Sequence, residues 1–527
     1  MLDQGQTIDP IIRLDASELA RRIRGRDLSA AEVTEAHIGR IEDVNPQLNA
    51  VVIPLFDEAR EQAAAADQAL QRGERVGPLH GVPITIKEQY RVAGTQTTLG
   101  ASKKIGNTYH DEGPLVTRLR EAGAIILGKT NIIQTLAGWE SDNPVYGRTN
   151  NPWNLDRTPG GSSGGEAAIV AAGGSALGLA GDFGGSTRLP AHFSGVHGYK
   201  PTSRRLSNTD FPPGLLEQGQ EAFIPQPGPL ARSMADIKLT MRLFAETSMG
   251  VTADLVPPAP WPDPEAINIS GLRVGVYTDN GYFSVSPAVR RAVDDAANAL
   301  RSMGATVDPI GSPDPEEAVR LFLRAVSAGG GTAFFDLLDG EKPIPQVAGL
   351  LRGVKMPAPM RPLVAKLMGL RGQHHLVRII RNARRSSAKE YLEVVAAINA
   401  YKMAFTGILD EANLDAVICP PVALPAFTHG SSEHLFPAVS YAFTYNVLGA
   451  PAGVVSITKV RRGEETDRDP GKDLADITAA QVEAGSAGLP LGVQVVARHW
   501  RDDIVLGVMS ALEEHFRTAP DYPNLLG

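Results

Sequence analysis

The chain has 527 residues, of which 43% are hydrophobic, and a formal net charge of −8. Its length permits a large buried core and by itself suggests roughly two to four domains. The acidic balance argues against a nucleic-acid-binding protein, because there is no general excess of basic residues to neutralise phosphates. Cys419 is the only cysteine, so neither an intrachain disulfide nor a cysteine-based metal site can form.

The N-terminal residues include acids and contain no apolar run of the length that an export signal needs. No later stretch offers about 18 uninterrupted apolar residues, the length that a membrane-spanning helix requires. The single cysteine is compatible with a reducing compartment. We therefore expect a cytoplasmic protein without stable membrane insertion.

Three amphipathic helices are predicted in the first part of the chain, over residues 15–24, 29–43 and 55–71. The second helix begins with Ser-Ala-Ala-Glu at residues 29–32, which has the form of a capping box. We predict that residues 1–75 form an N-terminal helical region that packs on a main domain.

From residue 81 onward, short β-branched runs alternate with helical segments. Strands are predicted over residues 81–87, 124–127, 272–277, 414–419, 452–458 and 491–497. Helices are predicted over residues 116–122, 165–172 and 288–302. Such alternation is typical of α/β domains with a parallel or mixed sheet. The polar residues 461–488 separate the last two strands and are interpreted as a surface insert.

Residues 342–389 differ from the rest of the chain in charge, because they contain no Asp or Glu but eleven Lys or Arg residues. Two interpretations are open. The segment could be the solvated face of surface helices. It could instead be a mobile basic cover on the substrate side, in which Met356, Met360 and Met368 offer adaptable apolar contacts to a hydrophobic substrate or the basic residues contact an acidic surface.

Two glycine–serine nests, at residues 160–165 and 184–186, flank an alanine-rich apolar segment. Glycine lets a reacting group approach the main chain closely, and successive exposed amides can hold a negatively charged oxygen. One such nest alone could equally be an ordinary loop. Two nests joined by an apolar segment favour a catalytic site at which two serine hydroxyls meet.

A serine nucleophile needs a base, which can be histidine or a lysine kept neutral by burial. His192 and His197 follow Ser186 closely, but no Gly-x-Ser-x-Gly elbow surrounds that serine, and we expect both histidines to be structural. Lys87 ends an apolar strand-like run, where loss of solvation favours the neutral amine. Lys87 is therefore the better candidate, although a lone lysine is usually an exposed structural residue.

Three motifs in order resemble those of the amidase signature family of serine hydrolases: GVPITIK at 81–87, GGSSGG at 160–165 and DFGGSTRLP at 182–190. The resemblance extends over most of the chain and includes NPW at 151–153 and LPLGVQ at 489–494. It implies one large α/β domain over residues 76–527, with a central mixed, mostly parallel β-sheet covered by helices on both faces. It also implies catalysis without a cofactor or metal ion.

The resemblance further implies a Ser-cisSer-Lys triad. In this family the serine of the third motif is the nucleophile, which corresponds to Ser186. The first serine of the paired-serine nest, Ser162, relays the proton from a cis peptide, and the lysine of the first motif, Lys87, acts as base and later as acid. The intermediate is an acyl-enzyme.

The family pattern also implies residues that support the triad. The oxyanion hole is expected from the backbone amides of Phe183, Gly184, Gly185 and Ser186, with support from Ser163, Asp182 and Arg188. The chain departs from the commonest pattern at Glu88, where aspartate is usual, at Phe183, where a smaller residue is frequent, and at Thr187, where isoleucine is common. The bulky Phe183 puts the shape of the acyl pocket in doubt, and the triad is unaffected.

Resemblance to the fatty acid amide hydrolase-like members places Leu136, Gly138 and Trp139 in an acyl channel. Ordinary core packing remains an equal alternative for Trp139. The predicted activity is hydrolysis of the C–N bond of amides with bulky apolar or aryl acyl groups. Carbamates (urethanes) and esters remain open as further small-molecule substrates, and we expect a monomer or homodimer.

Other functions compete with this prediction. The family includes the amidase subunit of the glutamine-dependent tRNA amidotransferase, which works with partner subunits, and amidases of small amides. The apolar surroundings of Trp139 and the basic segment argue weakly against the amidotransferase. A catalytically inactive scaffold is disfavoured because all three triad residues are present.

Overall fold

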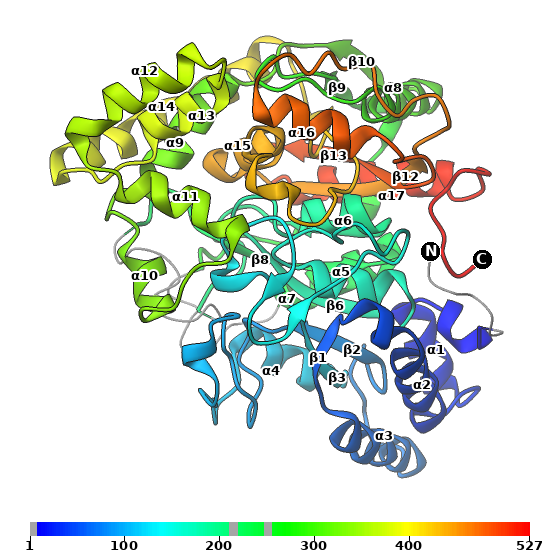
Figure 1. The fold of residues 1–527 in the computed structure, drawn as a ribbon. Coiled ribbons are helices and arrows are strands. Elements are labelled where there is room, and N and C mark those ends of the chain that lie inside the picture. Colours follow the sequence, from blue (N-terminus) through cyan, green and yellow to red (C-terminus); the bar gives the residue numbers. More distant parts are fainter. Residues whose placement is uncertain (1–7, 210–219, 247–255) are drawn as a thin grey trace.

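The computed structural model describes residues 8–209, 220–246 and 256–527. These residues form an 11-stranded sheet in the order β1-β3-β2-β6-β8-β7-β12-β13-β11-β9-β10 and a two-stranded ribbon of β4 and β5 (Figure 1). The strand bounds are β1 Val51–Pro54, β2 Pro83–Lys87, β3 Ile125–Thr130, β4 Asp142–Asn143, β5 Gly147–Arg148, β6 Leu177–Asp182, β7 His197–Lys200, β8 Gln226–Ala231, β9 Arg273–Val276, β10 Thr306–Pro309, β11 Ala416–Cys419, β12 Ala452–Lys459 and β13 Pro490–Ala497.

Helices flank this sheet and extend beyond it. Their bounds are α1 Ala16–Gly25, α2 Ala30–Leu48, α3 Phe56–Gln71, α4 Pro114–Glu121, α5 Gly164–Ala171, α6 Arg188–Ser194, α7 Met234–Glu246, α8 Pro287–Ser302, α9 Pro315–Val326, α10 Thr332–Leu338, α11 Pro345–Lys355, α12 Arg361–Leu370, α13 His374–Asn382, α14 Ala388–Glu411, α15 Ser440–Leu448, α16 Leu474–Glu483 and α17 Asp502–Phe516. Every residue of β2, β6, β8 and β13 is buried. Both faces of the sheet are therefore covered, as in α/β proteins generally.

The sheet is mixed, as predicted, but antiparallel pairs outnumber parallel ones. Parallel pairs join β2 to β3 and β6 at one end, and β9 to β10 and β11 at the other. The central strands β8, β7, β12 and β13 pair in antiparallel fashion. The sequence-based expectation of a mostly parallel sheet did not anticipate this centre, because β7 and β8, like β1, β6 and β10, lie outside the runs from which strands were predicted.

One core runs through the whole sheet. It includes Leu19 of α1, Ile169 of α5, Val293 of α8 and Val508 of α17. The chain is therefore a single α/β domain, and the estimate of two to four domains from length alone is wrong. Every predicted helix and strand is present within a few residues of its expected bounds, and the capping box of Ser29 and Glu32 forms at the start of α2.

The segment 461–488 is more than the predicted surface insert. It contains α16, whose Ala475, Ala479 and Val482 join the main core. Its loop is also held to the body by Arg468, which donates to the carbonyl of Ser284 at 2.6 Å. About one small apolar residue per turn is enough to bury one face of this short helix, and the polar composition of the segment hides so weak a pattern.

Of the helices in the described ranges, α14 alone has the length and hydropathy of a membrane-crossing helix, which is weak evidence because core helices of soluble proteins meet the same criteria. One face of α14, with Val394, Ile398 and Phe405, is buried, and the helix contacts α9 and α15. These contacts place α14 against the body of the protein.

Candidate active site

Adjacent parallel strands bring the sequence motifs to one edge of the sheet. Lys87 is the last residue of β2 and Asp182 is the last residue of β6, and these two strands are parallel neighbours. Their carboxyl ends therefore lie at the same edge, where open α/β sheets bind ligands. The loop that follows β6 carries Ser186, and the loop that precedes α5 carries Ser162.

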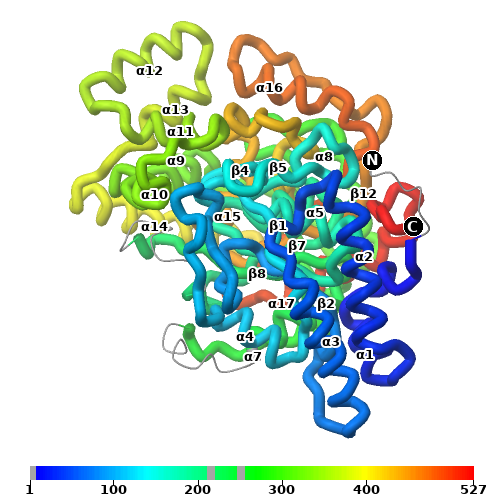
Figure 2. Tube along the Cα trace, turned by 60° about the horizontal axis from the view of Figure 1, so that its bottom comes forward, coloured from blue at the N-terminus to red at the C-terminus, as the bar shows by residue number. Residues whose placement is uncertain are grey.

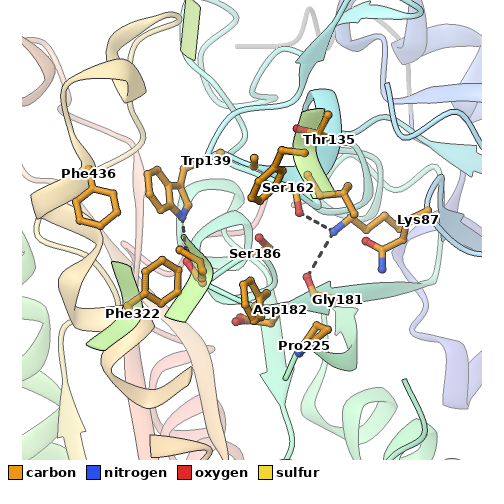
Figure 3. A pocket seen from close by; sticks show the side chains of 18 residues that line it. Lys87, Thr135, Trp139, Ser162, Gly181, Asp182, Ser186, Pro225, Phe322 and Phe436 are labelled. Carbon is orange, nitrogen blue, oxygen red and sulfur yellow. Dashed lines mark hydrogen bonds between the residues drawn. The ribbon is translucent and has the colours of Figure 1, made fainter. Parts of the chain in front are cut away.

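Lys87 and Ser162 are in direct contact. The Nζ atom of Lys87 lies 2.8 Å from Oγ of Ser162 and donates a weaker hydrogen bond to the carbonyl of Gly181 at 3.4 Å (Figure 3). Burial lowers the pKa of Lys87 to about 7, although the carboxylates of Asp182 and Glu166 act in the opposite direction. A substantial fraction of the amine is therefore neutral near pH 7 and able to accept a proton.

The peptide bond between Gly161 and Ser162 is cis. Glycine is required at position 161 because a Cβ atom there would lie 1.9 Å from the carbonyl oxygen of Glu140. The two nests are also joined directly, since the amide of Ser163 donates to the carbonyl of Ser186 at 3.3 Å. The hydroxyl of Ser163 donates to Gly181 at 3.3 Å. Ser163 thus holds the two serine loops together.

A buried ion pair shapes the loop that carries Ser186. Asp182 accepts hydrogen bonds from Nε and Nη2 of Arg188, both at 2.9 Å, and from the amide of Thr187 at 3.2 Å. Burial alone would raise the pKa of Asp182, but the Arg188 charge and its hydrogen bonds lower it below the usual range. A charged pair buried in this way needs further partners, and the structure supplies Asn446, which donates to Asp182 at 2.8 Å, and Gln494, which accepts from Arg188 at 2.6 Å.

The four amides expected to form the oxyanion hole are not equivalent. The amide of Gly185 donates to Asp182 Oδ1 at 2.9 Å, so it supports the loop and does not face a substrate. Within the described residues, the amides of Phe183, Gly184 and Ser186 have no hydrogen-bond partner. Gly185 has a φ of 98°, and a Cβ atom there would lie 2.5 Å from the Leu189 side chain, so this sharp turn requires glycine.

Ser162 and Ser186 both line a cavity whose empty space, about 750 Å³, includes a part that is open to solvent. On one side of Ser186 the wall is aromatic, with Trp139, Phe322 and Phe436, and Lys87 lies on the other side (Figure 3). Phe183 adds a further ring, which stacks on Phe223 with ring centroids 5.0 Å apart.

All three predicted channel residues, Leu136, Gly138 and Trp139, line the cavity. Trp139 lines the cavity and also packs against the main core. Its Nε1 donates to the carbonyl of Gly184 at 2.9 Å, which ties the aromatic wall to the loop of Ser186.

The two histidines near Ser186 have structural partners. His192 Nδ1 accepts from the amide of Gly492 at 2.9 Å, and His197 contacts Glu513 at 3.2 Å. Neither histidine is among the described residues that line the cavity.

Sequence reasoning missed several residues of the site. Gln494 ends the LPLGVQ segment at 489–494, which gave no indication of its contact with Arg188. Phe322 and Phe436, which line the cavity, and Asn446, which bonds to Asp182, lie more than a hundred residues from the three motifs that carry Lys87, Ser162 and Ser186. No local pattern could have identified them. Gln89, in contrast, follows Lys87 by two residues and could have been noticed as a polar neighbour of the proposed base.

In the described part of the chain, one group of residues could share a metal ion, namely His375, Asp473 and Asp476, whose ligand atoms lie within 4.8 Å of one another. Its carboxylates are already occupied, because Asp473 accepts from the amide of His375 at 3.0 Å and Asp476 contacts Arg468 at 3.3 Å. None of these residues lines the cavity, so the group has no connection with the serines.

Comparison with known proteins gives a consistent result. The family model described as "Amidase" matches residues 32–506. Fatty-acid amide hydrolase 1 of Sus scrofa is 30% identical over 516 residues, which cover 95% of this chain and 86% of that protein. A glutamyl-tRNA(Gln) amidotransferase subunit of Acidothermus cellulolyticus is 30% identical over 525 residues, covering 96% of this chain and 95% of that protein. The solved structure "Fatty acid amide hydrolase" has a TM-score of 0.82 at 28% identity and covers 97% of this chain and 86% of that chain.

Proposed function

Because this chain belongs to the amidase signature family and is an amide-hydrolysing enzyme, we propose that Ser186 is its nucleophile and that it prefers amides with large apolar or aryl acyl groups. The observation that carries this proposal is the contact of 2.8 Å between the buried Lys87 amine and Ser162 at the cavity that Ser186 also lines. A serine without such a relay is a weak nucleophile.

In the proposed mechanism, neutral Lys87 takes the hydroxyl proton of Ser162, and Ser162 in turn takes the hydroxyl proton of Ser186. The oxygen of Ser186 then attacks the acyl carbon of the substrate. The relayed proton then passes through Ser162 to the departing amine nitrogen, and an acyl-enzyme remains. Water releases the acyl group by the same route in reverse. The lowered pKa of Lys87, about 7, supports this role because the amine can both accept and return a proton near neutral pH.

We assign the oxyanion hole to the unpartnered amides of Phe183, Gly184 and Ser186. Amides held by a rigid loop stabilise the developing negative charge without reorganising during the reaction. The hydrogen bonds from Gly185 and Arg188 to Asp182 supply that rigidity. Asp182 and Arg188 are positioning residues in this proposal and take no part in bond making.

The acyl preference follows from the wall of the cavity. Trp139, Phe322 and Phe436 offer apolar surface on the side of Ser186 away from Lys87 (Figure 3). Each buried methylene contributes about 0.8 kcal/mol, so an acyl chain or ring gains affinity that an acetyl group lacks. Carbamates and esters carry the same acyl carbon and are proposed as secondary substrates.

The similarity to an amidotransferase subunit raises glutamine as an alternative substrate. Free glutamine has a charged amino group and a charged carboxylate, and both need charged partners in a binding site. Among the charged side chains described along the cavity, Lys87 contacts Ser162 and Asp182 is paired with Arg188. This favours an apolar amide over glutamine.

A substrate panel tests the proposed function. It contains the p-nitroanilides of acetic, phenylacetic and dodecanoic acid, an aryl carbamate, and glutamine. We expect kcat/KM for the phenylacetyl and dodecanoyl anilides to exceed that of the acetyl anilide by about tenfold or more, because each additional buried methylene adds affinity. Equal rates for all three anilides, or glutamine as the best substrate, would contradict the proposal.

We also propose that residues 342–389 form a cover through which apolar substrates reach the cavity. Leu363 and Leu370 of α12 are 70% and 79% exposed, and α12 lies at the margin of the molecule (Figure 2). The apolar residues between α12 and α13 form a small cluster of their own around Ala365 and Val377. Helices that share little core with the rest of the protein are the parts that open most easily.

The double variant Leu363→Ser with Leu367→Ser tests the cover. Both side chains are largely exposed, so folding should be unaffected. We expect the ratio of kcat/KM for the dodecanoyl over the acetyl anilide to fall about tenfold, because two apolar contacts with the incoming chain are lost. Leu392→Ser on α14 is the matched control, as this leucine is 67% exposed and lies outside the segment. If the ratio is unchanged in the double variant, the exposed leucines make no contact with substrate, and the segment is the solvated face of surface helices.

A further inference from the structure

Gln89 lines the cavity and carries an unpartnered carboxamide. Its side chain is fully buried, and within the described ranges neither Oε1 nor Nε2 has a hydrogen-bond partner. Two other polar side chains of the wall are satisfied: Thr135 donates to the carbonyl of Gln134 at 2.7 Å, and Trp139 donates to Gly184 at 2.9 Å. A buried amide without partners is unfavourable, so this donor and this acceptor favour a ligand that can pair with both.

The backbone holds Gln89 in this position. β2 ends at Lys87, and the amide of Tyr90 donates to the carbonyl of Lys87 at 3.0 Å, which closes a turn over the intervening residues. Glu88, between the two cavity residues, is directed elsewhere, because its carboxylate accepts from the amides of Thr98 at 2.5 Å and Leu99 at 3.2 Å. Lys87 and Gln89 therefore line the cavity from one turn.

The position of this turn determines which half of a substrate Gln89 can contact. The aromatic residues Trp139, Phe322 and Phe436 lie on one side of Ser186, and Lys87 lies on the other (Figure 3). In the proposed mechanism Ser162 returns the proton to the departing nitrogen, so the amine half of the substrate lies towards Ser162 and Lys87. The apolar acyl half then occupies the aromatic side.

We infer that Gln89 forms a polar subsite for the amine half of the substrate, and that this half carries its own hydrogen-bonding donor and acceptor. A primary carboxamide, a secondary amide or a carbamate has both groups and can bind Oε1 and Nε2 together. The substrate class is thus an apolar acyl group joined to an amine that bears a second amide-type group. This inference rests on the proposed function and narrows its substrate.

Matched substrates separate this subsite from general catalysis. Each pair shares a phenylacetyl group and differs only in the amine: glycinamide against isobutylamine, β-alaninamide against isopentylamine, and p-aminobenzamide against p-isopropylaniline. In each pair a branched alkyl group replaces a carboxamide of similar shape. We expect the wild-type enzyme to prefer at least one carboxamide over its apolar partner, because a buried polar group discriminates strongly against a ligand that leaves it unpaired.

The decisive variant is Gln89→Met, which keeps the length of the side chain and removes both polar atoms. We expect the ratio of kcat/KM for the preferred carboxamide over its apolar partner to fall about tenfold or more. The melting temperature should equal or exceed that of the wild type, because an unsatisfied buried amide is removed. A structural role predicts the opposite, namely a lower melting temperature and equal losses for both members of a pair.

Gln62→Met on α3 is the matched control, since among the described residues the Gln62 side chain bonds only to Glu58 on the same helix, and it should retain the wild-type ratios. A change of less than tenfold in all three pairs for Gln89→Met overturns the inference. Labelling of Ser186 in the wild type by a fluorophosphonate probe, with turnover of p-nitrophenyl phenylacetate, tests the proposed function separately. If neither occurs, the proposed function and the inference fall together; if both occur with unchanged ratios, only the inference falls.

Discussion

Replacing Ser186 by alanine is expected to lower kcat for amide hydrolysis by about 10⁴- to 10⁶-fold, as the loss of a serine nucleophile does in other hydrolases. The residual rate comes from the unpartnered amides of Phe183, Gly184 and neighbouring backbone, which still stabilise the oxyanion. Single-turnover hydrolysis of a phenylacetyl anilide, followed by chromatography of the released acid, measures the effect. The fluorophosphonate probe should fail to label the variant.

Ser163→Ala is the matched control for this prediction. Ser163 lies in the first nest, and in the described part of the chain its hydroxyl bonds only to the backbone of Gly181, at 3.3 Å and 3.5 Å. Its own amide, which bonds to the carbonyl of Ser186, survives the substitution. We expect a loss of about tenfold, the value of one modest hydrogen bond. If Ser186→Ala kept more than about a hundredth of the wild-type rate, Ser162 or another group would be the nucleophile.

The sequence could nominate the three candidate residues because each sits in a short motif whose glycines or apolar run reveal its surroundings. Lys87, Ser162 and Ser186 all line one cavity in the structure. The parallel pairing of β2 with β6 explains why motifs almost a hundred residues apart meet. Local patterns of this kind survive in the sequence because they depend on backbone geometry within a few residues.

The remainder of the site depends on tertiary packing and had no such signal. One of the four amides expected for the oxyanion hole, that of Gly185, donates a hydrogen bond to the carboxylate of Asp182 instead. This contact depends on the folded shape of the loop and has no signal in the sequence. Arg188 reaches the carbonyl of Ala442 and the side chain of Gln494, both more than 250 residues later in the chain. The fold was predictable to a similar extent: six strands were predicted from β-branched runs, whereas the Gly- and Pro-containing β8 and the short β1 were not.

Burial alone does not identify the base, because the chain has other buried lysines. Burial lowers the pKa of Lys200 to about 7 and that of Lys129 to about 8. Lys200 donates to the carbonyls of Ala450 at 2.5 Å and Pro201 at 3.3 Å, and carbonyl oxygens carry no proton that a base could take. Lys129 donates to Gln96 and Thr97, away from the cavity. Lys87 combines a lowered pKa with a serine hydroxyl at the cavity wall.

Lys87→Met is therefore expected to lower kcat/KM by about 10³-fold or more near pH 8, since both general base and general acid are lost. Only the neutral amine accepts a proton, so wild-type kcat/KM should rise with pH and level off above the Lys87 pKa of about 7. That ascending limb should be absent in the variant. Rates of anilide hydrolysis between about pH 5.5 and 9.5 measure both effects.

Lys87→Met should make the protein more stable although it lowers the activity. This combination distinguishes a catalytic base from a structural lysine. The folded pKa of Lys87, about 7, lies below the ordinary value of 10.5, so between these values the unfolded chain binds the extra proton. The contribution of Lys87 to the free energy of unfolding therefore rises with pH across this window. Lys87→Met should raise the melting temperature most at pH 7 and below, and this advantage should shrink towards pH 10.5. A variant that is less stable at pH 7, or that keeps the ascending limb, would show that Lys87 is not the neutral base.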